Sequence, residues 1–262
     1  MKLSAVLSRL FFLCTFWLCA ASAQATIVQF QTVLGEFEVN LYDDATPETV
    51  ANFLEYVESG TYEHTFFHRL IPGFILQGGG YQYDFETEDL ARIEAKPPVV
   101  NEPKFSNRRG TIAMAKRPHD PNSATIEWFI NLSHNHTNLD VQNGGFTVFG
   151  EVIGDGMEVV DALAKIKVLN FGGAFTDLPV RDYDENDGKA GEKVTDEHLV
   201  MVHNIMILDH DPDSAADLKP VPNTLIHEQP EKPDNKSSSS GSVSWWLLGM
   251  LLLSGLALRK RG

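Results

Sequence analysis

The stretch that decides the fold is Phe67-His68-Arg69-Leu70-Ile71-Pro72-Gly73-Phe74-Ile75-Leu76-Gln77, which continues into Gly78-Gly79-Gly80. It places one guanidinium, that of Arg69, among apolar and aromatic residues and near the amide side chain of Gln77. Removing a guanidinium from water is costly, so an arginine kept against an apolar wall usually has a fixed task. We therefore expect the function of the chain to centre on Arg69.

Three further segments follow this stretch. They are Gly110-Thr111-Ile112-Ala113-Met114-Ala115-Lys116, then Ser123-Ala124-Thr125-Ile126-Glu127-Trp128-Phe129-Ile130-Asn131, and then Val148-Phe149-Gly150-Glu151-Val152 with Gly156-Met157-Glu158-Val159-Val160. With the first stretch, they resemble the signature segments of the cyclophilin-type peptidyl-prolyl isomerases, and the bacterial exported branch is the most similar. The resemblance extends from about Thr26 to His210.

The periodicity between the two chain ends is mainly β. Alternating apolar residues predict strands at Thr26–Phe30, Gly35–Leu41 and Leu199–Leu208. One amphipathic helix is expected to begin at Thr46-Pro47-Glu48 and to end at Gly60, and a second to extend from Gly156 to Val168. The resemblance implies a mainly β fold, a closed eight-stranded antiparallel β-barrel capped by two α-helices.

The charge balance excludes nucleic acid as a partner. The 262 residues contain 21 Lys and Arg against 36 Asp and Glu, for a formal net charge of −15. Phosphate binding needs a basic face, which a chain of this composition does not favour. With 43% hydrophobic residues the chain has room for one sizeable core, and we expect a single monomeric domain.

The first 25 residues have the pattern of an export signal. Lys2 and Arg9 precede an apolar run from Leu10 to Ala21, and Ala23-Gln24-Ala25 supplies small residues for cleavage after Ala25. Both cysteines of the chain lie in this segment. The isomerase-like domain, residues 26–210, is therefore expected in the periplasm without a thiol or a disulfide.

The C-terminal part of the sequence predicts attachment to a membrane. Residues 211–242 are rich in Pro and Ser and are expected to form a disordered linker. Residues 243–258 are interpreted as a short hydrophobic anchor and residues 259–262 as a basic cytoplasmic end. The tail also resembles a GlyGly-CTERM sorting signal, so a retained anchor and a processed tail that releases the domain to the surface both stay open.

The resemblance implies catalysis of rotation about X-Pro bonds, which take tens to hundreds of seconds to isomerise unaided. In the twisted transition state the proline nitrogen regains its lone pair. A cationic hydrogen-bond donor directed at this nitrogen stabilises the twisted state over both planar forms. Arg69 corresponds to the catalytic arginine of the family. This chemistry needs no proton transfer, metal or other cofactor, and the expected partners are proline-containing polypeptides.

The resemblance also assigns a substrate groove. The positions assigned to substrate binding are Phe74, Ile75, Gln77, Ala115, Lys116, Glu127, Phe129, Leu139 and Phe146. The proline pocket corresponds to Phe74, Ile75, Phe129 and Leu139. Gln77 corresponds to an amide that supports the arginine, and Ala115-Lys116 to the edge that binds substrate backbone. The side chain of Lys116 is expected to influence only a neighbouring substrate residue.

Several positions depart from the family pattern. Glu127 and Trp128 stand where most members have glutamine and phenylalanine, Asn138 where many have tryptophan, and Phe146 where many have histidine or tyrosine. Glu127 matters most, because a carboxylate near Arg69 either draws the guanidinium away from substrate or fixes it in place. The sequence leaves both possibilities open.

Two other patterns were considered as metal sites and are interpreted as surface. His134 and His136 have a ligand-like spacing in a polar segment, and Asp182–Gly188 resembles a calcium loop whose glycine comes one place late. Acidic runs are more often solvated surface. The segments Gln82–Pro98 and Asn170–Glu197 exceed a minimal domain of the family and are interpreted as surface insertions.

The resulting hypothesis is a peptidyl-prolyl cis-trans isomerase that speeds the folding of exported proteins. The alternative, motivated by Glu127, is a module tethered at the membrane that binds proline-containing segments with little catalysis. A third possibility is a scaffold of the secretion pathway that binds partners through the acidic insertions. An assay of turnover on an X-Pro peptide separates the first hypothesis from the second.

Overall fold

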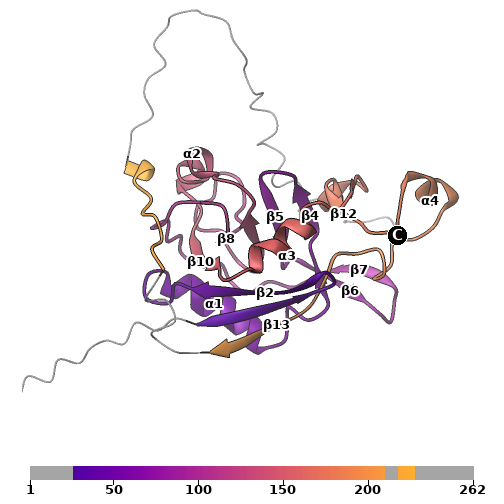
Figure 1. The fold of residues 1–262 in the computed structure, drawn as a ribbon, viewed down its shortest axis with the longest axis horizontal. Helices are drawn as coiled ribbons and strands as arrows, with labels where there is room; N and C mark the ends of the chain where they lie inside the picture. The colour runs from indigo at the N-terminus through magenta and orange to yellow at the C-terminus, as the bar shows by residue number, and fades with distance from the viewer. Residues whose placement is uncertain (1–25, 210–217, 228–262) are drawn as a thin grey trace, which may run out of the picture.

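The computed structural model describes residues 26–209 and 218–227 (Figure 1). The predicted export signal (1–25), hydrophobic anchor (243–258) and basic end (259–262) lie outside these residues, as does most of the predicted linker. Residues 218–227 correct the linker prediction, because they pair with the backbone around Phe105 and bury Asn223. Among the residues described, none of the helices has the length and apolar character that crossing a membrane requires.

The fold is mainly β, and eleven strands of the described residues form one antiparallel sheet. Their order across the sheet is β4-β5-β9-β8-β10-β2-β1-β13-β3-β6-β7. In chain order they are β1 (Ile27–Thr32), β2 (Gly35–Leu41), β3 (Thr65–Phe66), β4 (Arg69–Ile71), β5 (Ile75–Gly78), β6 (Tyr81–Asp84), β7 (Asp89–Arg92), β8 (Thr111–Met114), β9 (Trp128–Asn131), β10 (Val148–Val152) and β13 (Met201–Asp209). A separate small sheet pairs β11 (Val168–Leu169) with β12 (Leu178–Pro179).

The large sheet curls into a half-barrel with β4 and β7 at its ends, so the prediction of a closed eight-stranded barrel is wrong in strand count and in closure. The chain changes its pairing partner between β3 and β4. The N–H of Phe67 donates to the carbonyl of Val200 at 3.0 Å, and the N–H of His68 donates to that of Gln77 at 3.1 Å. The ladder therefore does not pass from β3 to β4, and the β6–β7 hairpin extends the other end of the sheet.

Both predicted helices are present, one with different bounds. α1 (Pro47–Glu58) has proline in its first turn, where the missing N–H costs nothing, and it buries Val50, Phe53 and Val57. α3 (Gly156–Leu163) stops short of the predicted end, because Val168 pairs in β11 instead. The short helices α2 (His136–Leu139) and α4 (Glu185–Ala190) are not indicated by any periodicity in the sequence.

The main core is rich in aromatic rings. Phe30 stacks on Phe37 with ring centroids 4.8 Å apart and meets Trp128 edge-on at 5.0 Å. Trp128 is fully buried, and the glycine run of the opening stretch passes close to it. Gly79 has a φ of +85°, and a Cβ there would lie 2.7 Å from the indole nitrogen. Glycine is therefore required where the indole meets the backbone.

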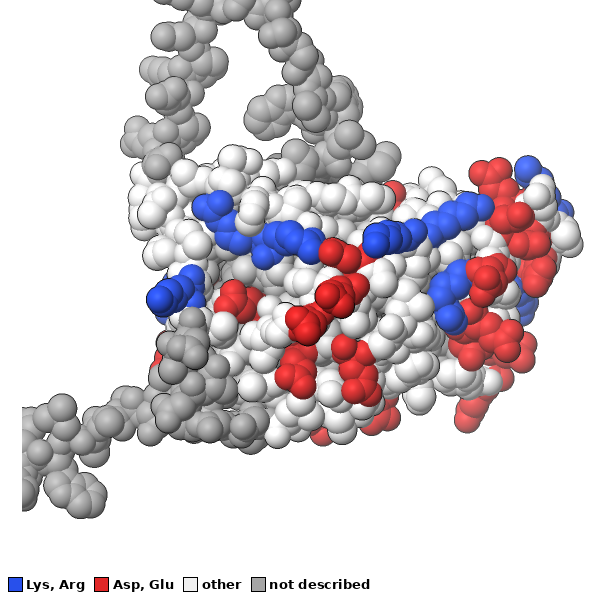
Figure 2. Space-filling view, viewed as in Figure 1, with Lys and Arg blue, Asp and Glu red and all other residues white. Residues whose placement is uncertain are grey.

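The two segments interpreted as surface insertions lie mostly at the surface, and they also contribute strands and a helix to the fold. Gln82–Pro98 supplies most of the β6–β7 hairpin, and Asn170–Glu197 supplies β12 and α4. Tyr83 from the first segment packs in one apolar cluster with Leu178 and Tyr183 from the second. Figure 2 shows acidic side chains gathered at the end of the molecule that carries α4 and this hairpin.

The acidic run Asp182–Gly188 takes part in a helix start. Asp184 precedes α4, and its carboxylate accepts hydrogen bonds from the backbone N–H groups of Asn186 and Asp187 in a capping box. The backbone hydrogen bond from Asn186 is the main reason that the pKa of Asp184 lies below its ordinary value. Within residues 26–209 and 218–227, no three His, Cys, Asp or Glu side chains are grouped as metal ligands.

Candidate active site

Arg69 stands in a row of side chains that crosses four neighbouring strands. Arg69 of β4 opposes Gln77 of β5, Gln77 opposes Phe129 of β9, and Phe129 opposes Ala113 of β8. Directly opposed residues of an antiparallel pair project on the same face of the sheet. The strand register therefore brings together the arginine, the amide and one wall of the predicted proline pocket.

The guanidinium of Arg69 is held at one end only. The residue is 7% exposed, and its Nε donates to Oδ2 of Asp177 at 3.3 Å. Its Nη1 is buried and has no hydrogen-bond partner in the described part of the chain. Burial lowers the pKa of Arg69, while the carboxylate of Asp177 and, to a smaller extent, that of Glu127 oppose this shift. One end of the guanidinium is thus fixed, and the other has unused donor capacity.

Glu127 binds the amide partner of Arg69, not Arg69 itself. Nε2 of Gln77 donates to Oε2 of Glu127 at 2.8 Å, and Nε2 of His68 lies 3.5 Å from the same oxygen. Burial raises the pKa of Glu127, but interactions with His68, Gln77 and Arg92 outweigh it, and the pKa lies below its ordinary value. The carboxylate therefore orients Gln77, and it neither draws Arg69 away nor binds it directly.

A second unused group lies directly across the ladder from Arg69. Oε1 of Gln77 is buried and accepts no hydrogen bond from the residues described. Leaving a buried donor and a buried acceptor unpaired is costly, so such groups usually have a partner in the functional state. Arg69 Nη1 and Gln77 Oε1 together offer a donor and an acceptor to a bound polar group.

The four predicted proline-pocket residues and Phe146, which was assigned to substrate binding, belong to or pack against one apolar cluster. Ile75, Phe129, Leu139 and Phe146 are buried in it with Ala115, and Phe74 packs against it while staying partly exposed. The rings of Phe129 and Phe146 meet edge-on with centroids 5.8 Å apart. The N–H of Phe146 donates to the carbonyl of Leu139 at 2.8 Å, which ties the two pocket residues together.

Lys116 is buried, and its ammonium binds the turn that precedes Phe146. Its Nζ donates to the carbonyls of Gly145 (2.5 Å) and Asn143 (2.9 Å) and lies 4.8 Å from the centroid of the Phe146 ring. Burial lowers the pKa of Lys116 to about 8. This placement differs from the expected influence on a neighbouring substrate residue, because the side chain is 3% exposed and supports the pocket wall.

The N–H of Ala115 donates to the carbonyl of Glu127.

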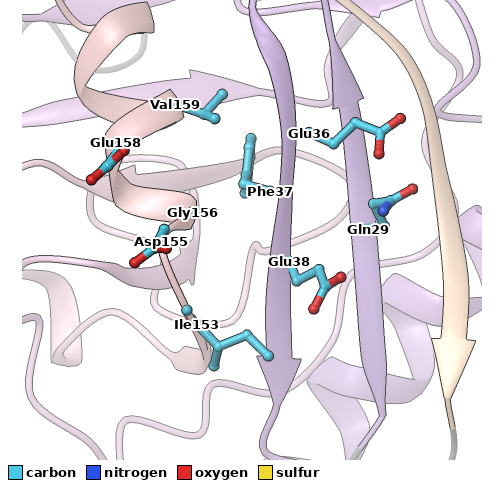
Figure 3. Close-up of a pocket in the computed structure, with 10 residues that line it drawn as sticks. Gln29, Glu36, Phe37, Glu38, Ile153, Asp155, Gly156, Glu158 and Val159 are labelled. Atoms are coloured by element: carbon cyan, nitrogen blue, oxygen red, sulfur yellow. The ribbon is translucent and has the colours of Figure 1, made fainter.

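A separate hollow of about 440 Å³ lies between β1, β2 and the start of α3 (Figure 3). Its lining includes the four carboxylates of Glu36, Glu38, Asp155 and Glu158, and it shares no residue with the Arg69 site. In the sheet, β9, β8 and β10 separate β5 from β2. An acidic lining does not suit a pyrrolidine ring, so we assign this hollow no part in the chemistry at Arg69.

Asp177 is the site residue that the sequence reasoning missed. It lies in Asn170–Glu197, and the backbone places it directly, because the N–H of Leu70 donates to its carbonyl at 2.8 Å. The only local signal is an acid immediately before the short apolar segment Leu178-Pro179. In a segment rich in Asp and Glu, that signal does not single out one carboxylate.

The chain is similar to several known proteins. The family model described as "Cyclophilin type peptidyl-prolyl cis-trans isomerase/CLD" matches residues 27–184. Peptidyl-prolyl cis-trans isomerase B of Escherichia coli is 41% identical over 164 residues, 60% of this chain and 94% of that protein. A peptidyl-prolyl cis-trans isomerase of Acinetobacter baylyi is 39% identical over 150 residues, 56% of this chain and 76% of that protein. A Cryptosporidium parvum isomerase crystallised with the dipeptide Ala-Pro has a TM-score of 0.49 at 23% identity, covering 70% of this chain and 99% of that one.

Proposed function

Because the chain belongs to the cyclophilin-type peptidyl-prolyl cis-trans isomerases, we propose that Arg69 is its catalytic residue and that its substrates are proline-containing segments of exported proteins. The chain is an enzyme that interconverts the cis and trans forms of X-Pro bonds. The observation that carries the assignment of Arg69 is its buried Nη1, which has no hydrogen-bond partner among the described residues and belongs to the row that contains Phe129 of the apolar cluster.

Arg69 stabilises the twisted form of the substrate bond more than either planar form. When the bond rotates out of plane, amide resonance is lost and the proline nitrogen becomes a hydrogen-bond acceptor. A buried cation that is already oriented stabilises the lone pair on this nitrogen without having to reorganise. Preorganised electrostatic stabilisation of this kind is usually the largest single contribution to catalysis. A rate increase of ~10⁵ would correspond to about 7 kcal/mol of stabilisation, shared with binding and desolvation.

The apolar cluster positions the proline ring and excludes water from the amide. Ile75, Phe129, Leu139 and Phe146 form a floor on which a pyrrolidine ring packs. With the ring fixed there, the polar pair of Arg69 Nη1 and Gln77 Oε1 is left for the substrate backbone. This division between an apolar floor and a polar pair requires no metal or covalent intermediate.

The alternative of a binding module without catalysis loses its motivation. It rested on Glu127 restraining the arginine, and the carboxylate instead accepts a hydrogen bond from Gln77. The remaining proposal concerns location: an exported, periplasmic enzyme that the C-terminal segment either anchors or releases after processing. It is supported by the sequence patterns of residues 1–25 and 243–262.

A protease-coupled assay on a short X-Pro peptide tests the catalytic proposal. We expect the parent protein to accelerate isomerisation and Arg69→Ala to lose most of that acceleration while keeping measurable peptide affinity. Arg109→Ala is the matched control, because Arg109 also pairs with a carboxylate but lies on the surface. Equal activity in parent and Arg69→Ala would remove Arg69 from the mechanism.

Fractionation of cells that express the tagged full chain tests the location, with a cytoplasmic product arguing against export.

A further inference from the structure

Residues 218–227 lie beside α2 (Figure 1). The N–H of Ser106 donates to the carbonyl of Val221, and the N–H of Asn223 donates to that of Lys104, both at 2.8 Å. Phe105 and Pro222 form an antiparallel bridge between these bonds. Proline suits this position, because neither hydrogen bond needs its missing N–H.

Asn223 is the buried contact of this segment. It is 7% exposed, and its Nδ2 donates to the carbonyl of Asp140 at 2.9 Å. Its Oδ1 accepts a hydrogen bond from the N–H of Ile226 at 3.2 Å. Both ends of the amide are engaged, which fixes its orientation. Asp140 directly follows the pocket residue Leu139, so the contact reaches the end of α2.

Asp140 connects this contact to the other pocket residue on the same loop. Its carboxylate accepts hydrogen bonds from Oγ of Ser106 at 2.6 Å and from the N–H of Asn107 at 2.7 Å. Nδ2 of Asn107 donates to the carbonyl of Phe146 at 3.3 Å. The tail and the pocket wall therefore share two groups, Ser106 and Asp140.

An apolar contact accompanies these hydrogen bonds. Leu218 and Phe105 pack against the cluster that contains Phe129, Leu139 and Phe146. Other parts of the segment stay at the surface, and Val221 is 45% exposed. The attachment of the segment thus depends on a few contacts. Asn223, through Asp140, and Leu218, through the apolar cluster, connect it to the pocket residues.

We propose that residues 218–227 act as a strap that positions the Leu139–Phe146 wall of the proline pocket, with Asn223 as the positioning residue. The strap belongs to the working enzyme although it follows the last strand of the sheet. Without it, the carbonyl of Asp140 loses a buried donor, and the segment from Leu139 to Phe146 is held less firmly. The inference rests on the assignment of this cluster as the proline pocket.

The test compares Asn223→Ala and Asn223→Asp with the parent in the full-length protein. The control is Thr224→Ala, which changes the next residue on the exposed side of the strap. Affinity for a short Ala-Pro peptide, kcat and KM in the protease-coupled assay, and hydrogen exchange of the Ser106 amide are measured, with melting curves to confirm folding. Removing one buried hydrogen bond should weaken peptide binding about fivefold and raise KM, with kcat within about twofold. Asn223→Asp should be weaker still, because its carboxylate would face the carbonyl of Asp140.

The readouts distinguish the strap from a purely structural tail. Faster exchange at Ser106 together with weaker peptide binding supports the proposal. Faster exchange with unchanged binding overturns it, as does an equal loss in Thr224→Ala. If Asn223→Asp does not fold, Asn223→Ala, which only removes atoms, carries the comparison. A parent protein that binds the peptide without turnover would contradict the catalytic proposal, while the binding titration would still test the strap.

Discussion

Two parts of the proposed active site are held by different kinds of structure. Arg69, Gln77 and Phe129 stand on paired strands, so the register of the sheet fixes their spacing. Leu139 is the last residue of α2 and Phe146 lies in the segment after it, and the position of this segment depends on contacts made by Lys116 and Asn223. Changes on the strand side should therefore remove the chemistry, and changes on the loop side should alter how the substrate is held.

Replacing Arg69 tests the strand side and should have the largest effect. Arg69→Ala removes the only cation of the row, and we expect kcat/KM to fall by about 100-fold or more, as for loss of an oriented oxyanion donor. Arg69→Lys keeps a charge but loses the planar fork, so it should recover little of the activity. Turnover is measured on an X-Pro peptide, with a melting curve to show that the fold persists. Activity in Arg69→Lys close to the parent would mean that charge alone is sufficient.

Asp177 tests whether the strand register alone is enough to place the guanidinium. Asp177→Ala leaves the Nε of Arg69 without its acceptor, and we expect kcat/KM to fall about tenfold, equivalent to about 1.4 kcal/mol. Asp177→Asn keeps an oxygen that accepts from Nε and should lose less. The matched control is Asp161→Asn, because Asp161 forms a surface pair with Arg109 and its side chain has similar exposure, 43% against 39% for Asp177.

The prediction for the strand side is wrong if the carboxylate of Asp177 is dispensable. Parent-like kinetics in Asp177→Ala would show that burial and the backbone hold the guanidinium without help from the carboxylate of Asp177. A loss in Asp161→Asn equal to that in Asp177→Ala would attribute the effect to the general acidity of the surface.

Glu127 tests how much the carboxylate that binds Gln77 contributes to stability and how that contribution depends on pH. Because the folded pKa of Glu127 lies below its ordinary value, its ionised form contributes stability at neutral pH. That contribution is lost as the pH falls from about 4.3 through the folded pKa. Melting temperatures of the parent and Glu127→Gln should therefore differ at pH 7 and converge in acid. Activity should change only a few-fold, since an amide at 127 can still accept from Gln77; a large gain in Glu127→Gln would mean that the carboxylate restrains Arg69.

The same contrast explains what the sequence could predict. The sequence proposes Arg69, Gln77 and Phe129 because they lie in strands with distinctive local motifs, and β1, β2, β13 and α1 follow from periodicity. Asp177 and Asn223 act through contacts with residues distant in the chain, and each lies in a segment whose composition suggests a loop or a linker. The closed barrel was implied by the family resemblance and is wrong, and the change of pairing partner at Phe67-His68 gives no signal in the alternation of apolar residues.

Lys116 tests the loop side and should have the smallest effect on activity. Burial lowers its folded pKa to about 8, so the unfolded chain binds the proton more strongly between about pH 8 and pH 10.4. Stability relative to Lys116→Met should therefore rise with pH across that window, because the folded state no longer has to bury a charge. Denaturant unfolding at pH 7, 9 and 10 measures the difference. Lys104→Met is a control, since Lys104 is exposed. A stability difference between parent and Lys116→Met that stays constant with pH would contradict this prediction. It would mean that the carbonyls of Asn143 and Gly145 compensate fully for the buried charge, and that the loop wall is held as firmly as the strands.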